Sequence, residues 1–126
     1  MKKLFVLLFS LLISFNSYGE WTKITTDTEG NVLFIEFDTI KEWDGYVYFW
    51  HMHDYLKPKT GGMMSTKMYI QVDCGVLRYK PLLFVSYQQS MGKGESSTHT
   101  PPEKWHYAVT GKTIMRELNE VCEYIN

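Results

Sequence analysis

Two histidines in one short segment are the residues with the plainest capacity for metal chemistry. In His51-Met52-His53-Asp54, a strand would place His51 and His53 on one face, about 7 Å apart along it. Imidazole is a ligand for zinc and copper, and His99 or His106 could supply a third donor. The alternative is a polar strand face on which the histidines stack among Tyr and Trp. We expect no resident metal or cofactor, and His51 and His53 are the candidate ligands for a metal or small molecule.

Two polar segments contain residue types used in catalysis without the required spacing. Gly92-Lys93-Gly94-Glu95 has the glycines and lysine of a phosphate loop, but no Ser or Thr follows the lysine and no helical pattern follows the segment. Ser96, Ser97 and His99 lie close together, but no nucleophile motif accompanies them. A hairpin tip and a solvated loop account for these segments, so we expect no catalytic residue and no enzyme.

Aromatic residues are concentrated in the segment Tyr46–Tyr55, which contains both histidines. As a strand, it carries Phe49 and Tyr55 on one face. The opposite face carries four large side chains: Tyr46, Tyr48, Trp50 and Met52. If a helix covers only one face of the sheet, the other presents an aromatic patch, which is typical of an interaction site or a dimer seam. The alternative is that both faces are buried.

The N-terminus has the three-part pattern of a secretory signal peptide. Lys2-Lys3 precedes an apolar run from Leu4 to Ile13, and small residues precede a cleavage site after Gly19. The run is roughly half of the ~20 residues that span a bilayer. Because no cysteine follows it, we expect an exported protein of the periplasm or cell surface that is not a lipoprotein. The expected organisation is a signal peptide over 1–19 and one domain over 20–126.

Cleavage changes the charge balance, because Lys2 and Lys3 leave with the leader. Basic residues fall from 13 to 11 against 14 acidic ones, which gives a net charge of −3. Nothing resembles the basic patch of a nucleic-acid binder. We therefore expect a protein partner, such as a host matrix or envelope protein, and neither nucleic acid nor a membrane span.

Alternating apolar residues and turn signals predict an antiparallel sheet. The predicted strands are Trp21–Thr26, Val32–Phe37, Tyr46–Tyr55, Ser65–Asp73, Val76–Tyr87 and Trp105–Val109. Asp27–Asn31 and Asp44-Gly45 supply turns. Gln88–Glu103 is polar and contains glycines and prolines, so it is expected to be an exposed loop.

The pattern becomes helical after Gly111, with Thr113 as the expected N-cap. Five apolar residues recur on one helical face: Ile114, Leu118, Val121, Cys122 and Ile125. Strands followed by one helix predict an α+β domain, in which a curved antiparallel sheet of about five to six strands packs against the C-terminal helix.

The two cysteines of the chain are expected to form one disulfide, because an exported protein meets an oxidising compartment. Cys74 falls on the apolar face of the Ser65–Asp73 strand, and Cys122 lies in the apolar stripe of the helix. A bond between them would clamp the helix onto the sheet. The alternative is two buried free thiols.

Several segments together resemble the surface-adhesin protein E family of Gram-negative bacteria. They span nearly the whole mature chain: Trp21, Val72-Asp73-Cys74, the Tyr87–Gly94 stretch with Gly92-Lys93-Gly94-Glu95, and Trp105 followed by a helix ending in Val121-Cys122. The most specific part is the Asp-Cys and Val-Cys anchors with a Trp ahead of the second.

This resemblance implies a curved antiparallel sheet of about six strands, with the C-terminal helix tied to it by a disulfide. It also implies an adhesin-like binding role, since the founding member of the family is an outer-membrane lipoprotein that binds host matrix and plasma proteins. The present sequence lacks the lipidation cysteine, which favours the periplasm. No binding residue is carried over, because the family's ligand-binding regions have no compact motif that matches here.

Overall fold

The computed structural model describes residues 20–126, so the expected signal peptide over 1–19 lies outside the described residues. Within the described part there are seven strands, two short 3-10 turns and one helix. In chain order they are β1 (Thr22–Thr26), β2 (Val32–Trp43), β3 (Tyr46–Lys59), η1 (Thr60–Gly62), β4 (Met63–Asp73), β5 (Arg78–Gln89), η2 (Ser90–Gly92), β6 (Lys93–His99), β7 (His106–Tyr107) and α2 (Thr113–Tyr124).

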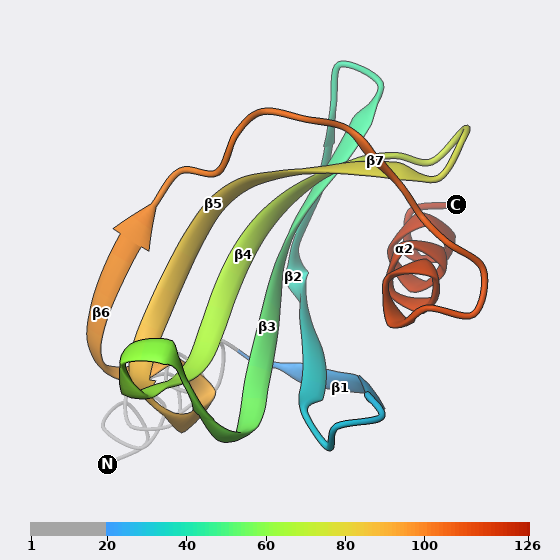
Figure 1. Ribbon diagram of the computed structural model, residues 1–126. Coiled ribbons are helices and arrows are strands. Elements are labelled where there is room, and N and C mark those ends of the chain that lie inside the picture. Colours follow the sequence, from blue (N-terminus) through green and yellow to red (C-terminus); the bar gives the residue numbers. More distant parts are fainter. Residues whose placement is uncertain (1–19) are drawn as a thin grey trace, which may run out of the picture.

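The strands form one antiparallel sheet in the order β1-β2-β3-β4-β5-β6, and β7 pairs with the beginning of β5 (Figure 1). Each of the first six strands therefore lies beside its neighbour in sequence. The sheet curls, and α2 lies on its concave side (Figure 1). This arrangement confirms the predicted α+β fold, with a curved antiparallel sheet and one C-terminal helix. The helix is not of the length and hydropathy that a membrane crossing requires, and residues 20–126 contain no other α-helix.

Tight turns of the expected chemistry join the strands. Asp44 and Gly45 connect β2 to β3 with φ values of 52° and 83°, which is the positive-φ pair that a two-residue hairpin favours. Between β1 and β2, the Asp27 carboxylate accepts hydrogen bonds from the backbone N–H groups of Glu29 and Asn31, each at 2.9 Å. These local contacts set the register of the first three strands, which carry most of the residues discussed below.

The hydrophobic core lies between the concave face of the sheet and α2. Its fully or almost fully buried members are Ile35, Val47, Phe49, Ile70, Val72, Leu118, Val121 and Cys122. They come from the predicted apolar faces of the strands and from the predicted stripe of the helix. Burial of each large side chain contributes roughly 1.5–3 kcal/mol, so a short helix that is marginal alone is stabilised by packing.

A disulfide joins the sheet to the helix, as predicted. Cys74 follows β4 directly and is bonded to Cys122 near the end of α2, with the two Cα atoms 5.9 Å apart. The alternative of two free thiols is therefore wrong.

Two strands are longer than predicted. β2 continues beyond Phe37 to Trp43, and β3 continues beyond Tyr55 to Lys59. Pairing between β2 and β3 shifts register between Glu36 and Lys41. Such an irregularity breaks the apolar alternation, which is the signal that a sequence provides for a continuous strand.

The predicted exposed loop Gln88–Glu103 is wrong for its central part, because Lys93–His99 forms β6. All seven residues of this strand are exposed, and it pairs with β5 alone. An edge strand without a buried face has no apolar alternation, so periodicity cannot identify it.

The predicted helix cap is also wrong. Lys112 occupies the N-cap position without a side-chain hydrogen bond, and Thr113 is the first helical residue.

Candidate interaction surface

α2 covers only the concave face of the sheet, so the opposite face, here called the convex face, carries the predicted aromatic residues. Tyr46, Tyr48 and Trp50 of β3 are partly exposed there. Met52 points to the same face but is fully buried. A β-carbon on Gly92 would lie 3.6 Å from the Met52 sulfur, which shows that the η2 turn packs over this end of the face. Met52 therefore does not belong to the predicted patch.

Three neighbouring aromatic rings form the middle of the convex face. Trp50 on β3 lies opposite Tyr69 on β4, with ring centroids 5.0 Å apart, and Tyr48 stacks on Tyr69 at 6.1 Å. We call Tyr48, Trp50 and Tyr69 the central aromatic row. Burial, with a smaller contribution from Tyr48, raises the pKa of the Tyr69 phenol. The Tyr69 phenol therefore stays uncharged near neutral pH.

A lysine held between two aromatic rings borders the central aromatic row. The Lys67 ammonium lies 5.5 Å from the ring centroid of Trp21 and 5.3 Å from that of Tyr87. Cation–π attraction of this kind fixes the position of a charge that would otherwise move freely. With Glu36 and Trp50, these side chains line an open hollow of about 210 Å³. Burial raises the pKa of the Glu36 carboxyl, and the charge of Lys67 partly offsets this shift.

A second hollow lies on the other side of the row. Its volume is about 370 Å³, and it is lined by Lys41, Glu42, Trp43, Tyr48 and Tyr69. Trp43 is 68% exposed, which is unusual for so large an apolar side chain. The two hollows meet at the contact between Trp50 and Tyr69, so the aromatic surface is continuous from Trp43 on β2 to Tyr87 on β5.

Trp105, which precedes β7, closes one end of the convex face. Its ring lies 4.3 Å from the Arg78 guanidinium carbon, 4.7 Å from the Lys80 ammonium and 5.5 Å from the ring of Tyr46. Arg78 also donates a hydrogen bond to the Asp73 carboxylate at 3.0 Å. The face is thus bounded by Trp105 at one end and by η2 at the other, with the central aromatic row between them.

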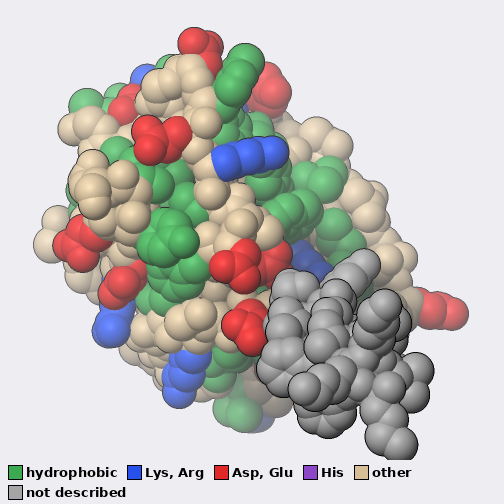
Figure 2. Space-filling view, turned by 180° about the vertical axis from the view of Figure 1, so that it is seen from behind, with side chains coloured by type: hydrophobic (Ala, Val, Ile, Leu, Met, Phe, Trp, Pro, Cys, Tyr) green, Lys and Arg blue, Asp and Glu red, His purple; other side chains and the backbone are tan. Residues whose placement is uncertain are grey.

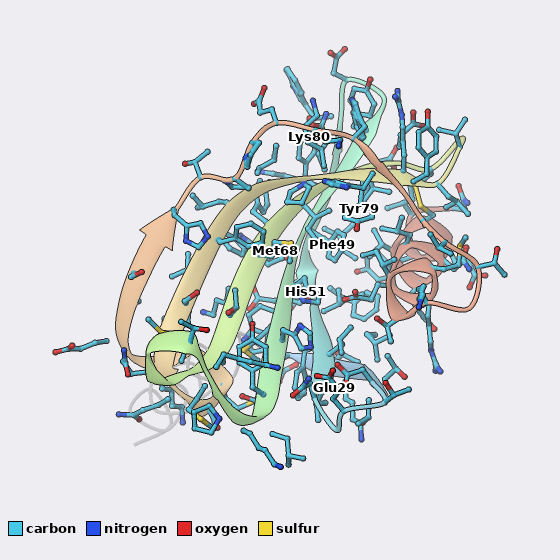
Figure 3. All side chains as sticks on the ribbon, viewed as in Figure 1. Glu29, Phe49, His51, Met68, Tyr79 and Lys80 are labelled. Carbon is cyan, nitrogen blue, oxygen red and sulfur yellow. A yellow bond between two sulfur atoms is a disulfide. The ribbon has the colours of Figure 1, made fainter. Side chains whose placement is uncertain are left out.

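Figure 2, which shows the molecule from behind, has hydrophobic side chains on the surface interspersed with acidic and basic ones. Figure 3 shows Tyr79 and Lys80 pointing to opposite sides of β5, with Tyr79 on the side of α2.

The sequence-predicted histidines lie on the concave side of the sheet, beneath α2. His51 is buried, its Nδ1 atom is paired with the Glu117 carboxylate of α2, and its Nε2 atom has no partner among the described residues. His53 lies nearer the surface, with its Nε2 atom 3.3 Å from an Asp27 oxygen. Burial and the neighbouring His51 lower the pKa of His53, and the hydrogen bond to Asp27 partly offsets this.

These contacts do not assemble into a metal centre. The His51 and His53 rings meet edge to face at 5.8 Å, but each is paired with a different carboxylate. His99 packs against Phe84, and His106 stacks on Tyr79. Across residues 20–126, no three His, Cys, Asp or Glu side chains are placed to hold a metal ion.

The polar segment considered for catalysis is spread along the edge strand. Ser96 and Ser97 are consecutive residues of β6, so their side chains point to opposite faces. Gly92 ends the η2 turn between β5 and β6, whereas Lys93, Gly94 and Glu95 lie in β6, so the expected hairpin tip is correct for Gly92 alone.

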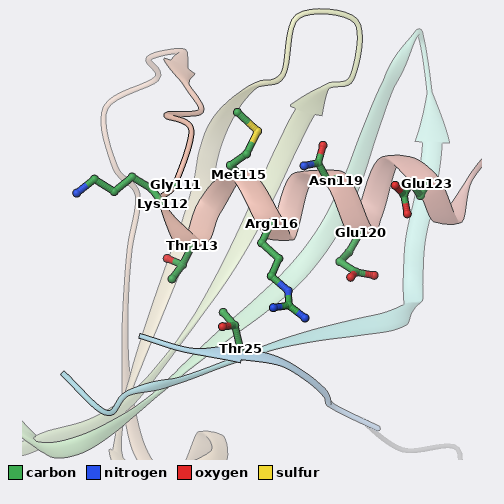
Figure 4. A pocket seen from close by; sticks show the side chains of 9 residues that line it. All are labelled: Thr25, Gly111, Lys112, Thr113, Met115, Arg116, Asn119, Glu120 and Glu123. Carbon is green, nitrogen blue, oxygen red and sulfur yellow. The ribbon is translucent and has the colours of Figure 1, made fainter. Parts of the chain in front are cut away.

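A further hollow, of about 410 Å³, lies between β1 and the outer side of α2 (Figure 4). Thr25 and one side of the helix along its length line it, and its charges are mixed, with Lys112 and Arg116 against Glu120 and Glu123. It contains no aromatic side chain, in contrast to the convex face. A hollow of this composition lacks the large apolar anchors that dominate binding energy.

Comparison with known proteins agrees with the fold. The family model of surface-adhesin protein E matches residues 21–123. Crystal form II of Haemophilus influenzae protein E superposes with a TM-score of 0.62 at 15% identity, covering 84% of this chain and 90% of that one. The Se-Met form of Haemophilus influenzae protein E gives a TM-score of 0.59 at 17% identity, covering 80% and 85%. At these identities, the likeness shows a shared fold. No curated protein matches the sequence.

Because the family model covers almost all of the described residues, the chain belongs to the surface-adhesin protein E family.

Proposed function

We propose that this protein is an exported, non-enzymatic interaction protein of the adhesin type, which acts through protein–protein contact at its convex face. The observation that carries the proposal is the uncovered central aromatic row, Tyr48, Trp50 and Tyr69, flanked by two hollows. Tyr and Trp supply much of the binding energy at protein interfaces, because they bury a large area and lose little conformational entropy. Membership of an adhesin family supports the same reading.

The proposal includes a location and a class of partner. Residues 1–19 are a signal peptide that is removed on export, and residues 20–126 form the working domain in the periplasm or at the cell surface. The partner is a host matrix or envelope protein. A mature net charge of −3 disfavours nucleic acid as the partner. A second copy of the chain is the alternative occupant of the same face.

Capture from matrix and envelope extracts tests this proposal. The immobilised protein is compared with the double variant Tyr48→Ser/Trp50→Ser, which removes the aromatic row. Val109→Ser is the matched control, because Val109 is an exposed apolar residue in the connection between β7 and α2. We expect a partner that the native protein and the control retain and that the double variant loses. No retained protein, together with turnover of a substrate by the purified chain, would overturn the proposal.

A second candidate function is binding of a small ligand or metal at His51 and His53. It is favoured by one observation, the buried Nε2 atom of His51 without a hydrogen-bond partner. Elemental analysis of the untagged protein tests the metal form of this candidate. Stoichiometric zinc or copper that is lost in His51→Ala would support it, and protein free of metal would exclude it.

A further inference from the structure

Positive charges flank the central aromatic row on both sides, although the mature protein is acidic overall. Along β4, the convex face carries Lys67, Tyr69 and Gln71, and Gln71 lies opposite Lys80 of β5. Along the direction of β4, Lys67 therefore lies on one side of Tyr69 and Lys80 lies on the other. Four residues of extended strand separate Lys67 from Gln71, which corresponds to about 13 Å.

Neither of these two ammonium groups forms a salt bridge with a described carboxylate, although Glu36 lines the hollow of Lys67. In residues 20–126, the four salt bridges involve neither Lys67 nor Lys80, whereas Arg78 is paired with Asp73. Aromatic rings hold both lysines, Trp21 and Tyr87 around Lys67 and Trp105 beside Lys80. Charges held in place before binding give up less conformational entropy when a partner arrives.

The same face is unsuited to a continuous polyanion. The central aromatic row between Lys67 and Lys80 offers no cation to the middle of such a chain. A partner with two separated acidic groups and an apolar group between them matches the two lysines and the row.

We propose that the convex face binds an extended, acidic segment of a partner protein, with one large apolar side chain on the central aromatic row and carboxylates two residues to either side of it, at Lys67 and Lys80. Acidic residues four positions apart in an extended chain lie about 13 Å apart, the same as the separation along β4 between Lys67 and Gln71, the residue that pairs with Lys80. This inference rests on the proposed function, because it names the chemistry of the protein partner at the same surface.

The test uses synthetic peptides and the protein recovered after export. The probe is Glu-Thr-Phe-Thr-Glu with blocked ends, compared with Lys-Thr-Phe-Thr-Lys and Glu-Thr-Ser-Thr-Glu, and with heparin as a polyanion. Binding is followed by ¹⁵N NMR shifts. We expect the first peptide to bind most tightly, with shifts confined to the convex faces of β3, β4 and β5. In Lys67→Glu and Lys80→Glu, its Kd should rise about tenfold or more, whereas Lys112→Glu at the start of α2 should change it less than twofold.

Lys67→Met keeps most of the apolar stem and removes the charge, so it separates loss of charge from loss of packing. A Kd raised about fivefold or more in this variant, with an unchanged NMR spectrum elsewhere, supports the inference. Equal or tighter binding of the basic peptide, preference for heparin, or no peptide binding would overturn it. If an extract partner is lost in Tyr48→Ser/Trp50→Ser but retained in both charge reversals, the proposed function stands and this inference fails.

Discussion

The buried pair of His51 and Glu117 is the polar contact that links α2 to the middle of the sheet. Both side chains are almost inaccessible to solvent, and the pair lies within the apolar core. A buried pair of this kind costs desolvation when it forms, but removal of one partner leaves the other without compensation. The contact therefore fixes the position of α2 on the sheet, and its net contribution to the stability of the fold is small.

Replacement of the carboxylate should expose this asymmetry. Glu117→Leu leaves His51 without its hydrogen-bond partner on α2, and we expect a loss of about 3 kcal/mol in the free energy of unfolding. Glu117→Gln keeps a hydrogen-bonding group and should lose less. Urea unfolding measures both, with Glu123→Leu on the exposed side of α2 as control. A loss in Glu117→Leu no larger than that of the control would show that the pair does not matter.

His53 should make stability depend on pH. Because burial and the neighbouring His51 lower its pKa in the folded protein, the unfolded chain binds a proton more readily near pH 6.5. The stabilisation by neutral His53 is complete above about pH 6.5 and is lost as the pH falls from there towards the lower folded pKa. His53→Gln should flatten the free energy of unfolding over this window. Chemical denaturation at a series of pH values checks the slope, and a slope that His53→Gln leaves unchanged contradicts the assignment.

The residues of the candidate surface were predictable only in part. Alternation along β3 places Tyr48 and Trp50 on one face, and alternation along β4 places Lys67 and Tyr69 on one face. Which residues of β3 lie beside which residues of β4 depends on the register of the two strands, and no local sequence pattern provides that register. Glu117 was not predicted to be buried, because its partner His51 lies 66 positions away in sequence.

At the scale of elements, the disulfide and the apolar stripe hold α2 on the concave face of the sheet. Both were predictable, because the periods of a strand and a helix place Cys74 and Cys122 on apolar faces. β6 was not predictable, since all its residues are exposed and its stability comes from pairing with β5.

Reduction should release the helix before the sheet. The bond closes a loop of 48 positions, which in the chain-entropy account stabilises the fold by about 4 kcal/mol. Reduction, or Cys122→Ser, should therefore increase amide hydrogen exchange in α2 more than in β3 and β4. The Cys122→Ser variant should not respond further to reductant, which controls for other effects of the reagent. Unchanged protection of α2 in both cases would show that the bond does not clamp the helix.

The whole molecule separates a structural side from the side that we propose for binding. The concave side is occupied by α2, the disulfide and the buried histidine, while the convex side presents an aromatic row between fixed lysines. One short helix can cover only one face of a curled sheet of this width, so an uncovered face follows from the architecture. The sequence indicates this possibility through the aromatic residues on both faces of β3, and the covered face is decided by the packing of α2.

The most direct test of the working surface is oxidative footprinting of the aromatic side chains, with and without the partner captured from extract. Mass spectrometry then reports the change in solvent access at each Trp and Tyr of the chain. The proposed interface predicts protection of Tyr48, Trp50 and Tyr69 in the complex. It predicts no change at Tyr124, which is 56% exposed on α2. Protection of Tyr124 with unchanged labelling of the central aromatic row would place the interface on the helix and contradict the account.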